Sequence, residues 1–261
     1  MGDPTGMSVN YLWRWFGTAL CFFLFGFFSF LVWAILFPVI AVFLGEGVAK
    51  KRRSRHLMHW VLRRYIGIMR TLGLLSYEVE SGERLNRPGR LIVANHPSLI
   101  DVVFLLSLTR NATCIVKPTL LRNPFMRIPI RAVGYVYADD PKKLMEVCEE
   151  ELREGSSLII FPEGTRTTPG QPVKFQRGAA NIALKSGAKI LPVRIDCTPT
   201  TLTKQEKWYQ IPPKRVLFRL QVGDDIDPCE QGDGDKRTIA ARNLTAYLEQ
   251  YFLASQSGAK R

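Results

Sequence analysis

The sequence has two long stretches that lack charge of one or both signs. From Trp15 to Leu44 there is no charged residue, and from Lys50 to Arg70 there is no acidic residue but eight lysines and arginines. The first stretch exceeds the roughly 20 residues that span a bilayer. It is too long for a signal peptide and does not end in a small-residue cleavage site. We therefore expect a membrane-embedded helical segment, either a single tilted span or a helix pair broken near Pro38.

Sites built on cysteine or on clustered metal ligands are also missing. The five cysteines are scattered, odd in number and form no CxxC pair. This pattern argues against a disulfide framework or a zinc site and fits a reducing cytoplasm. His56 and His59 have no third ligand nearby, so solvated positions on a basic helix explain them better than metal binding. We predict no metal and no cofactor.

The charge balance indicates an anionic partner. The chain has 36 basic and 23 acidic residues, a net charge of +13. The basic run directly follows the apolar stretch and carries no aromatic RNA-binding motif, which favours membrane lipid over nucleic acid. By the positive-inside bias, we expect the inner (cytoplasmic) membrane, with the folded domain on the cytoplasmic face.

The periodicity divides the chain into three parts. Residues 1–75 are expected to hold the membrane segment and a basic amphipathic helix, His56–Leu75, lying on the membrane. Residues 76–254 alternate strands and helices, and 255–261 are expected to be a disordered tail. The alternation predicts an α/β fold with a mostly parallel twisted sheet and flanking helices. The predicted strands are Tyr77–Glu80, Arg90–Ala94, Thr113–Val116, Gly134–Tyr137, Ser157–Phe161, Lys189–Ile195 and Val216–Val222. The predicted helices of this part are Leu99–Leu108, Pro141–Glu154, Gln176–Ser186 and Lys236–Leu253.

A histidine and a carboxylate lie together at one strand end. The segment NHPSLID, residues 95–101, follows the predicted strand Arg90–Ala94 and leads into an apolar helix. A carboxylate at Asp101 can hold the Nδ1 proton of His96 and leave Nε2 free to accept a proton. No serine elbow or cysteine nucleophile lies beside this pair. The pair is therefore predicted to act directly as a general base on a hydroxyl or an amine.

A second polar turn, PEGTR, follows the predicted strand Ser157–Phe161. Gly164 would let backbone amides approach a ligand closely, and Arg166 offers a planar fork for phosphate or carboxylate. Glu163 can accept hydrogen bonds from hydroxyls or hold Arg166, and Thr165 lies between the two charged residues. Taken alone, the turn fits a surface ion pair equally well.

Together, NHxxxxD and FPEGTR some sixty residues later resemble the glycerolipid acyltransferase family, which includes the 1-acylglycerol-3-phosphate O-acyltransferases and lysophospholipid acyltransferases. The resemblance covers about Tyr77 to Val222. KPTLLRNPFMRIPIRAVG, residues 117–134, is similar to the block before the third family motif, and Ile190–Val193 is similar to the proline-containing fourth block.

The resemblance implies acyl transfer from a thioester on coenzyme A or acyl carrier protein to a hydroxyl of a lysophospholipid. It implies that His96 is the general base and that Asp101 orients it. It also implies that the acceptor or the reacting centre is bound by Glu163, Gly164, Thr165, Arg166 and Lys117. We expect backbone amides near Gly164 to stabilise the oxyanion.

Two positions depart from the family pattern. Asp140 stands where an arginine that can bind the acceptor's phosphate is expected, and it suits a helix N-cap instead. Gln176 stands where a lysine is frequent, with Arg177 one position later. A different lipid-like acceptor, such as a lyso-aminolipid or a polyene or glycolipid scaffold, therefore stays open. So do a non-catalytic module that binds anionic lipid and a hydrolase in which His96 activates water.

Overall fold

The computed structural model describes residues 9–31, 47–122, 127, 130, 131, 133–167, 174–232 and 236–258. The centre of the fold is a six-stranded sheet in the order β1-β6-β5-β2-β4-β3. All neighbouring strands are parallel except β5 and β6. The predicted α/β fold with a mostly parallel sheet is confirmed. The strands are β1 Leu75–Glu80, β2 Leu91–Ala94, β3 Ala112–Cys114, β4 Ser157–Ile160, β5 Ile190–Thr198 and β6 Val216–Val222.

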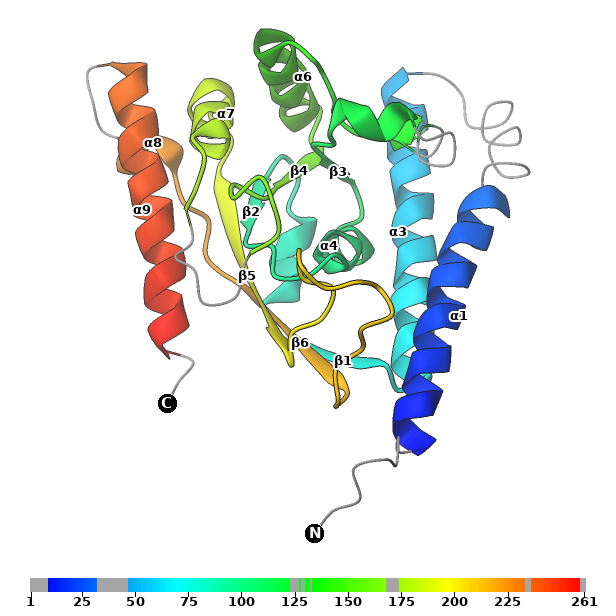
Figure 1. The fold of residues 1–261 in the computed structure, drawn as a ribbon. Coiled ribbons are helices and arrows are strands. Elements are labelled where there is room, and N and C mark those ends of the chain that lie inside the picture. The colour runs from blue at the N-terminus through cyan, green and yellow to red at the C-terminus, as the bar shows by residue number, and fades with distance from the viewer. Residues whose placement is uncertain are drawn as a thin grey trace.

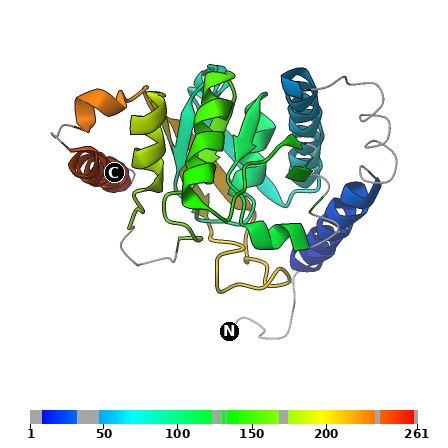
Figure 2. The ribbon, with the colours of Figure 1, turned by 90° about the horizontal axis from the view of Figure 1, so that it is seen from above.

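Helices cover both faces of the sheet (Figures 1 and 2). The α-helices are α1 Val9–Leu31, α3 Gly47–Thr71, α4 Asp101–Leu108, α6 Pro141–Arg153, α7 Gly178–Ser186, α8 Pro228–Gln231 and α9 Arg237–Gly258. Among the described residues, the 3-10 helix η2 Gly82–Asn86 lies between β1 and β2, and η3 Pro118–Arg122 lies between β3 and α6. The helix α9 runs four residues past Ala254, where the predicted tail begins.

Alternate residues of each strand pack into two separate cores. In β2, Leu91 and Val93 face α6, α7 and α9, whereas Ile92 and Ala94 face α1, α3 and α4. A parallel strand covered on both faces reads as a continuous apolar run, which explains the sequence LIVA. This double coverage makes the ends of the strands the places where polar side chains reach solvent.

Most of the predicted basic amphipathic helix, His56–Leu75, lies in α3, and its position on a membrane stays a prediction. Its apolar residues Leu62, Ile66 and Met69 are buried in the core beneath the sheet, where α3 packs against α4. Arg55 is also buried, and its guanidinium lies 2.7 Å from a carboxylate oxygen of Glu151. The basic run therefore contributes to the domain itself, because one side of the helix is needed to close the core.

One predicted strand is absent. Gly134–Tyr137 forms only an isolated bridge, between Val136 and Ile115. Gly134 has a φ of 68°, in the left-handed region, and it follows a turn closed by a hydrogen bond to Arg131. That conformation does not continue into an extended strand.

Within the part of the chain that the structure describes, no helix is both long and apolar enough to cross a membrane. The predicted break near Pro38 lies outside the described residues.

Candidate active site

The predicted histidine and carboxylate meet at the carboxyl end of β2. The Nδ1 atom of His96 lies 3.0 Å from Oδ2 of Asp101. The same carboxylate oxygen accepts a 2.6 Å hydrogen bond from the backbone N–H of Ser98. Asp101 is the first residue of α4, where the helix dipole favours a negative charge. The pair is fixed by a short turn between a buried strand and a buried helix.

The environment of the pair favours one tautomer. Asp101 is fully buried, whereas 17% of the His96 side chain is exposed. Because the carboxylate accepts the Nδ1 proton, Nε2 is the nitrogen that can receive a proton. The imidazole also stacks on Phe161, with ring centroids 4.1 Å apart and an interplanar angle of 21°. These two contacts restrict the rotation of the ring.

Burial changes the acidity of Asp101. Removal from water raises the pKa of its carboxyl to about 6, against the opposing effect of the hydrogen bonds from His96 and Ser98. The Oδ1 atom has no hydrogen-bond partner among the described residues. At neutral pH the carboxylate is ionised and directs its charge at the imidazole through Oδ2.

The PEGTR turn lies directly beside this pair, because β4 is the parallel neighbour of β2. An Oε1 atom of Glu163 accepts 3.0 Å hydrogen bonds from the backbone N–H of His96 and from the hydroxyl of Thr167. The backbone N–H of Thr167 donates in turn to the carbonyl of His96, at 2.7 Å. Glu163 was predicted to hold hydroxyls or Arg166; in the structure it connects the two turns.

Gly164 turns the chain beside Glu163. Its φ is 68°, and a Cβ at this position would lie 2.5 Å from Nε2 of Gln176. The Gly164 N–H donates to the carbonyl of Phe161 at 3.0 Å. This N–H is therefore used within the turn, and the stabilisation of an oxyanion by other backbone amides near Gly164 stays a prediction. The glycine is needed for the turn conformation and for close approach of Gln176.

The Arg166 guanidinium is bound within the protein. Its Nη1 donates to the carbonyls of Leu202 and Thr203, at 2.8 and 2.9 Å. The backbone N–H of Leu99 donates to the same Leu202 carbonyl at 3.2 Å. The loop between β5 and β6 is thus attached to both polar turns.

The remaining predicted positions are exposed or serve another role. Lys117 and Thr165 are exposed, and no contact joins Lys117 to His96, Glu163 or Arg166 among the described residues. Lys117 follows β3, which lies two strands from β2 in the sheet. Asp140 caps α6 as predicted, accepting hydrogen bonds from the backbone N–H groups of Lys142 and Lys143.

Sequence reasoning missed the role of Asn95. Its side-chain amide donates to the carbonyl of Ile195 at 2.8 Å, and its Oδ1 accepts from the Ile195 N–H at 2.7 Å. Asn95 thereby imitates a backbone pair and extends the β2–β5 ladder by one step, up to the residue before His96. The only sequence signal was a polar amide directly after a buried strand.

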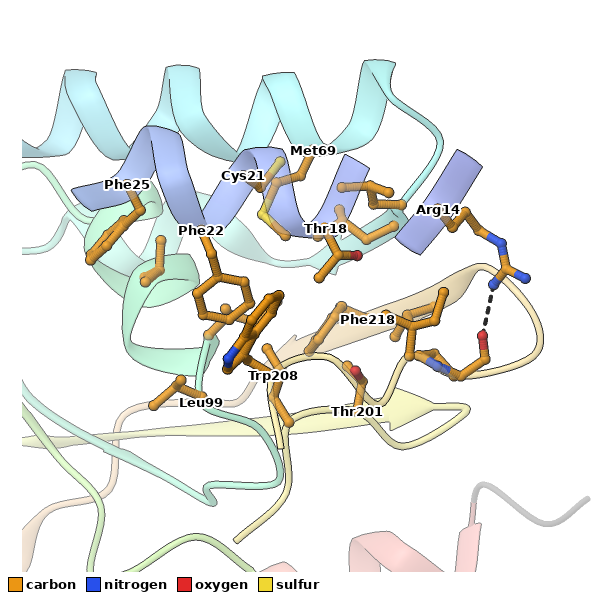
Figure 3. A pocket seen from close by; sticks show the side chains of 18 of the residues that line it. Arg14, Thr18, Cys21, Phe22, Phe25, Met69, Leu99, Thr201, Trp208 and Phe218 are labelled. Carbon is orange, nitrogen blue, oxygen red and sulfur yellow. Dashed lines mark hydrogen bonds between the residues drawn. The ribbon is translucent and has the colours of Figure 1, made fainter. Parts of the chain in front are cut away.

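An apolar cavity of about 260 Å³ begins beside the histidine turn (Figure 3). Leu99 and Ile100 of the turn form one side, α1 and α3 form another, and the β5–β6 loop closes it. Arg14 fixes α1 to this loop through hydrogen bonds to the carbonyls of Pro212 and Pro213, at 2.9 and 2.7 Å. The labelled residues of the lining include Thr18, Cys21, Phe22, Phe25, Met69, Thr201, Trp208 and Phe218.

Histidine, cysteine and carboxylate side chains do not gather in threes at any described place that could hold a metal ion.

Comparisons with known proteins identify the family of this chain. The model of the Acyltransferase family matches residues 76–196, which contain both polar turns. The chain is 36% identical over 170 residues to the 1-acyl-sn-glycerol-3-phosphate acyltransferase of Helicobacter pylori, covering 62% of this chain and 70% of that protein. It is 28% identical over 166 residues to the enzyme of the same name from Pseudomonas aeruginosa, covering 61% of this chain and 65% of that protein.

The fold is similar to that of a solved structure. The 1-acyl-sn-glycerophosphate (LPA) acyltransferase PlsC from Thermotoga maritima superposes with a TM-score of 0.67. The match covers 91% of this chain and 95% of that one, at 22% sequence identity. The likeness therefore extends beyond the family match to the helices before and after it. From the two turns, their geometry and these relatives, the chain belongs to the acyltransferase family that contains the 1-acyl-sn-glycerol-3-phosphate acyltransferases.

Proposed function

We propose that this protein transfers an acyl group from a thioester, on coenzyme A or acyl carrier protein, to the free hydroxyl of a 1-acyl-glycerol-3-phosphate. The observation that carries the proposal is the oriented His96–Asp101 pair, whose imidazole is partly exposed to solvent, beside an apolar cavity. The names of the relatives supply the acceptor class.

In this mechanism Nε2 of His96 removes the proton of the acceptor hydroxyl while its oxygen attacks the thioester carbonyl. The ionised Asp101 stabilises the imidazolium that forms. When the tetrahedral intermediate collapses, the C–S bond breaks and the imidazolium returns the proton to the leaving thiolate. The thioester is already activated, so the reaction needs no covalent acyl-enzyme.

The cavity supplies a place for an acyl chain. Its lining is almost entirely apolar, and Leu99 at its edge lies only three residues from His96. A chain held there would present its carbonyl end towards the histidine, which converts an encounter in solution into an oriented reaction. The exposed cations Lys117, Lys174 and Arg177 are the candidates to attract the acceptor's phosphate, since Arg166 is bound to the β5–β6 loop.

We further propose that the protein works at the cytoplasmic face of the inner membrane, with α1 against lipid. Aromatic side chains in such numbers on one solvent-exposed helix suit a bilayer interface, where indole and phenyl rings gather. The exposed apolar residues of α1 include Leu12, Trp13, Trp15, Phe16, Phe23 and Phe27.

The test is transfer of a labelled acyl group in membranes that contain wild type or His96→Ala. A positioned base contributes about 10²–10⁴-fold, and we expect the variant to lose activity by that factor. Equal transfer by both proteins would refute the catalytic role and leave a lipid-binding module as the explanation.

Two further assays distinguish the proposed function from a different acceptor class and from thioester hydrolysis. Lysophospholipids with and without a terminal phosphate monoester, supplied in parallel, identify the acceptor class. Thioester consumption without added acceptor measures hydrolysis. Consumption that does not increase with acceptor would show that His96 activates water instead.

A further inference from the structure

A second cavity lies at the amino ends of the strands, whereas His96 lies at their carboxyl ends. It has a volume of about 390 Å³, and its walls come from the amino ends of β2, β3 and β4 and from the first turns of α3. His96 follows the carboxyl end of β2, whose four residues span about 13 Å. The length of strand β2 therefore separates the cavity from His96.

Three of the cations that line this cavity have structural partners, and one of them, Arg87, lies 3.0 Å from a carboxylate oxygen of Asp225. Arg55 donates to Glu151, to the hydroxyl of Ser156 and to the carbonyls of Val133 and Gly134. Lys51 lies 3.0 Å from a carboxylate oxygen of Glu151. These contacts fix α3 to α6 and to the amino end of β4. They place the amino end of α3 rigidly over the cavity.

Two other cations that line the cavity, Arg52 and Arg110, are exposed and have no ion pair among the described residues. Arg52 comes from α3 and Arg110 from the loop between α4 and β3. His56, one helical turn from Arg52, lines the same cavity. Partial burial is the largest cause that lowers the pKa of His56, and the positive charges of Arg52 and Arg110 lower it further. Both arginines therefore act on the region around His56.

A buried hydroxyl completes the cavity. Thr109 lines the wall, is only 2% exposed, and its Oγ1 has no hydrogen-bond partner in the described part of the chain. A buried hydroxyl without a partner carries a free-energy cost that a ligand oxygen can remove. The cavity thus combines two exposed guanidinium groups, an imidazole and an unpaired hydroxyl donor.

We propose that this cavity binds the phosphate group of an anionic ligand, with Arg52 and Arg110 as the principal ligands and His56 and Thr109 as further donors. The planar guanidinium matches two phosphate oxygens at once. The carboxylate of Glu154 also lines the cavity and weakens the attraction. The site is independent of the proposed acyl transfer, and it accepts phosphate from a soluble ester or from a lipid headgroup.

The experiment is calorimetric titration of the purified full chain with inorganic phosphate and, in parallel, flotation with phosphatidylcholine vesicles with and without phosphatidate. The test variant is Arg52→Gln/Arg110→Gln. The matched control is Arg63→Gln/Arg64→Gln, which removes the same charge from exposed positions of α3 outside the cavity. We expect the test variant to lose affinity by about tenfold or more, as for lost hydrogen bonds to charged groups, and the control to retain it.

Glu154→Gln gives an opposite and independent signal, since removal of the lining carboxylate should tighten phosphate binding. The same titration on His96→Ala should match wild type, which separates this site from the catalytic proposal. Binding to soluble phosphate assigns the site to free phosphate esters, whereas cavity-dependent binding to phosphatidate vesicles alone assigns it to lipid; either supports it. No binding in either arm, or equal losses in the test and control variants, would overturn it.

Discussion

The turns that follow β2 and β4 lie side by side, both contain a carboxylate and a second polar group, and they use them differently. In the β2 turn, Asp101 directs its charge at His96 and leaves a ring nitrogen available to a substrate. In the β4 turn, Glu163 and Arg166 are bound to backbone groups of neighbouring segments. The comparison teaches that one turn leaves an oriented imidazole nitrogen open to a ligand, whereas the other holds that turn and the β5–β6 loop in place.

The sharpest way to break this comparison is to neutralise one carboxylate in each turn. We expect Asp101→Asn to lower acyl transfer by about 10²–10⁴-fold, because the imidazolium loses its counter-charge and the tautomer is no longer fixed. Glu163→Gln keeps an oxygen that can accept the same hydrogen bonds and should cost about tenfold or less. Initial rates at saturating thioester measure both. Similar losses in the two variants would show that the turns do not differ in this way.

The buried carboxylate of the β2 turn also predicts a pH effect on stability. Between pH 3.8 and about 6, folded Asp101 keeps a proton that the unfolded chain releases. Its contribution therefore falls as pH rises through this window and is constant above it. The rise in pKa corresponds to about 3 kcal/mol. From pH 4 to pH 7.5 the free energy of unfolding should therefore decrease by about 2 kcal/mol more in wild type than in Asp101→Asn, because the unfolded carboxyl is already partly ionised at pH 4. Parallel changes in the two proteins would contradict the shift.

A glycine with positive φ lies on each side of β4: Gly164 in the turn after the strand and Gly155 just before it. The two positions can therefore be compared as a test variant and its control. Gly164→Ala and Gly155→Ala both strain a left-handed residue, at roughly 1–2 kcal/mol each. Only the first lies beside Glu163, which binds the backbone N–H of His96, so strain there acts on the support of His96; the end of the Gln176 side chain, 2.5 Å from the added Cβ, can move away. We expect a loss of between about tenfold and 10²-fold in activity for Gly164→Ala and little change for Gly155→Ala. Thermal unfolding of both variants controls for stability, and equal activities would contradict the supporting role.

The smallest expected effect is at Asp140, outside both turns. Asp140→Ala removes the N-cap of α6 and should cost about 1 kcal/mol of stability, measured by denaturant unfolding. Activity at a temperature where both proteins are folded should be unchanged. A decrease in the KM for the acceptor would instead place Asp140 near the acceptor's phosphate, because its carboxylate repels that group.

Much of the site could be predicted because its key pairs are local in sequence or follow neighbouring strands. His96 and Asp101 are five residues apart, and the strand-to-helix turn between them is readable from LIVA and the apolar residues after it. The strand β6 was predicted with its observed bounds, since its apolar residues alternate. Both depend on short-range periodicity.

The failures concern partners that are distant in sequence. The apolar stripe of α3 was correctly read as amphipathic, but a stripe does not say whether protein or lipid covers it. The Arg166 guanidinium is satisfied by carbonyls 36 and 37 residues away, in a loop with no repeating pattern. Gly164 was predicted to let backbone amides approach a ligand, and the sequence did not show that its own N–H donates to the carbonyl of Phe161. The sequence identifies the hydrogen-bond donors of Arg166 and Gly164, but it does not identify the carbonyls that accept from them.

The Leu202 carbonyl, which accepts from both Leu99 and Arg166, has a practical consequence for redesign. Leu202 is therefore a poor position at which to change the length of acyl chain that the cavity would accept. A substitution that shifts its backbone would also move the histidine turn, through the hydrogen bond from Leu99. The α1 wall offers a better position. Thr18 and Phe22 line the same cavity from a helix that neither polar turn contacts through the hydrogen bonds described above. Libraries aimed at chain preference should vary that wall first.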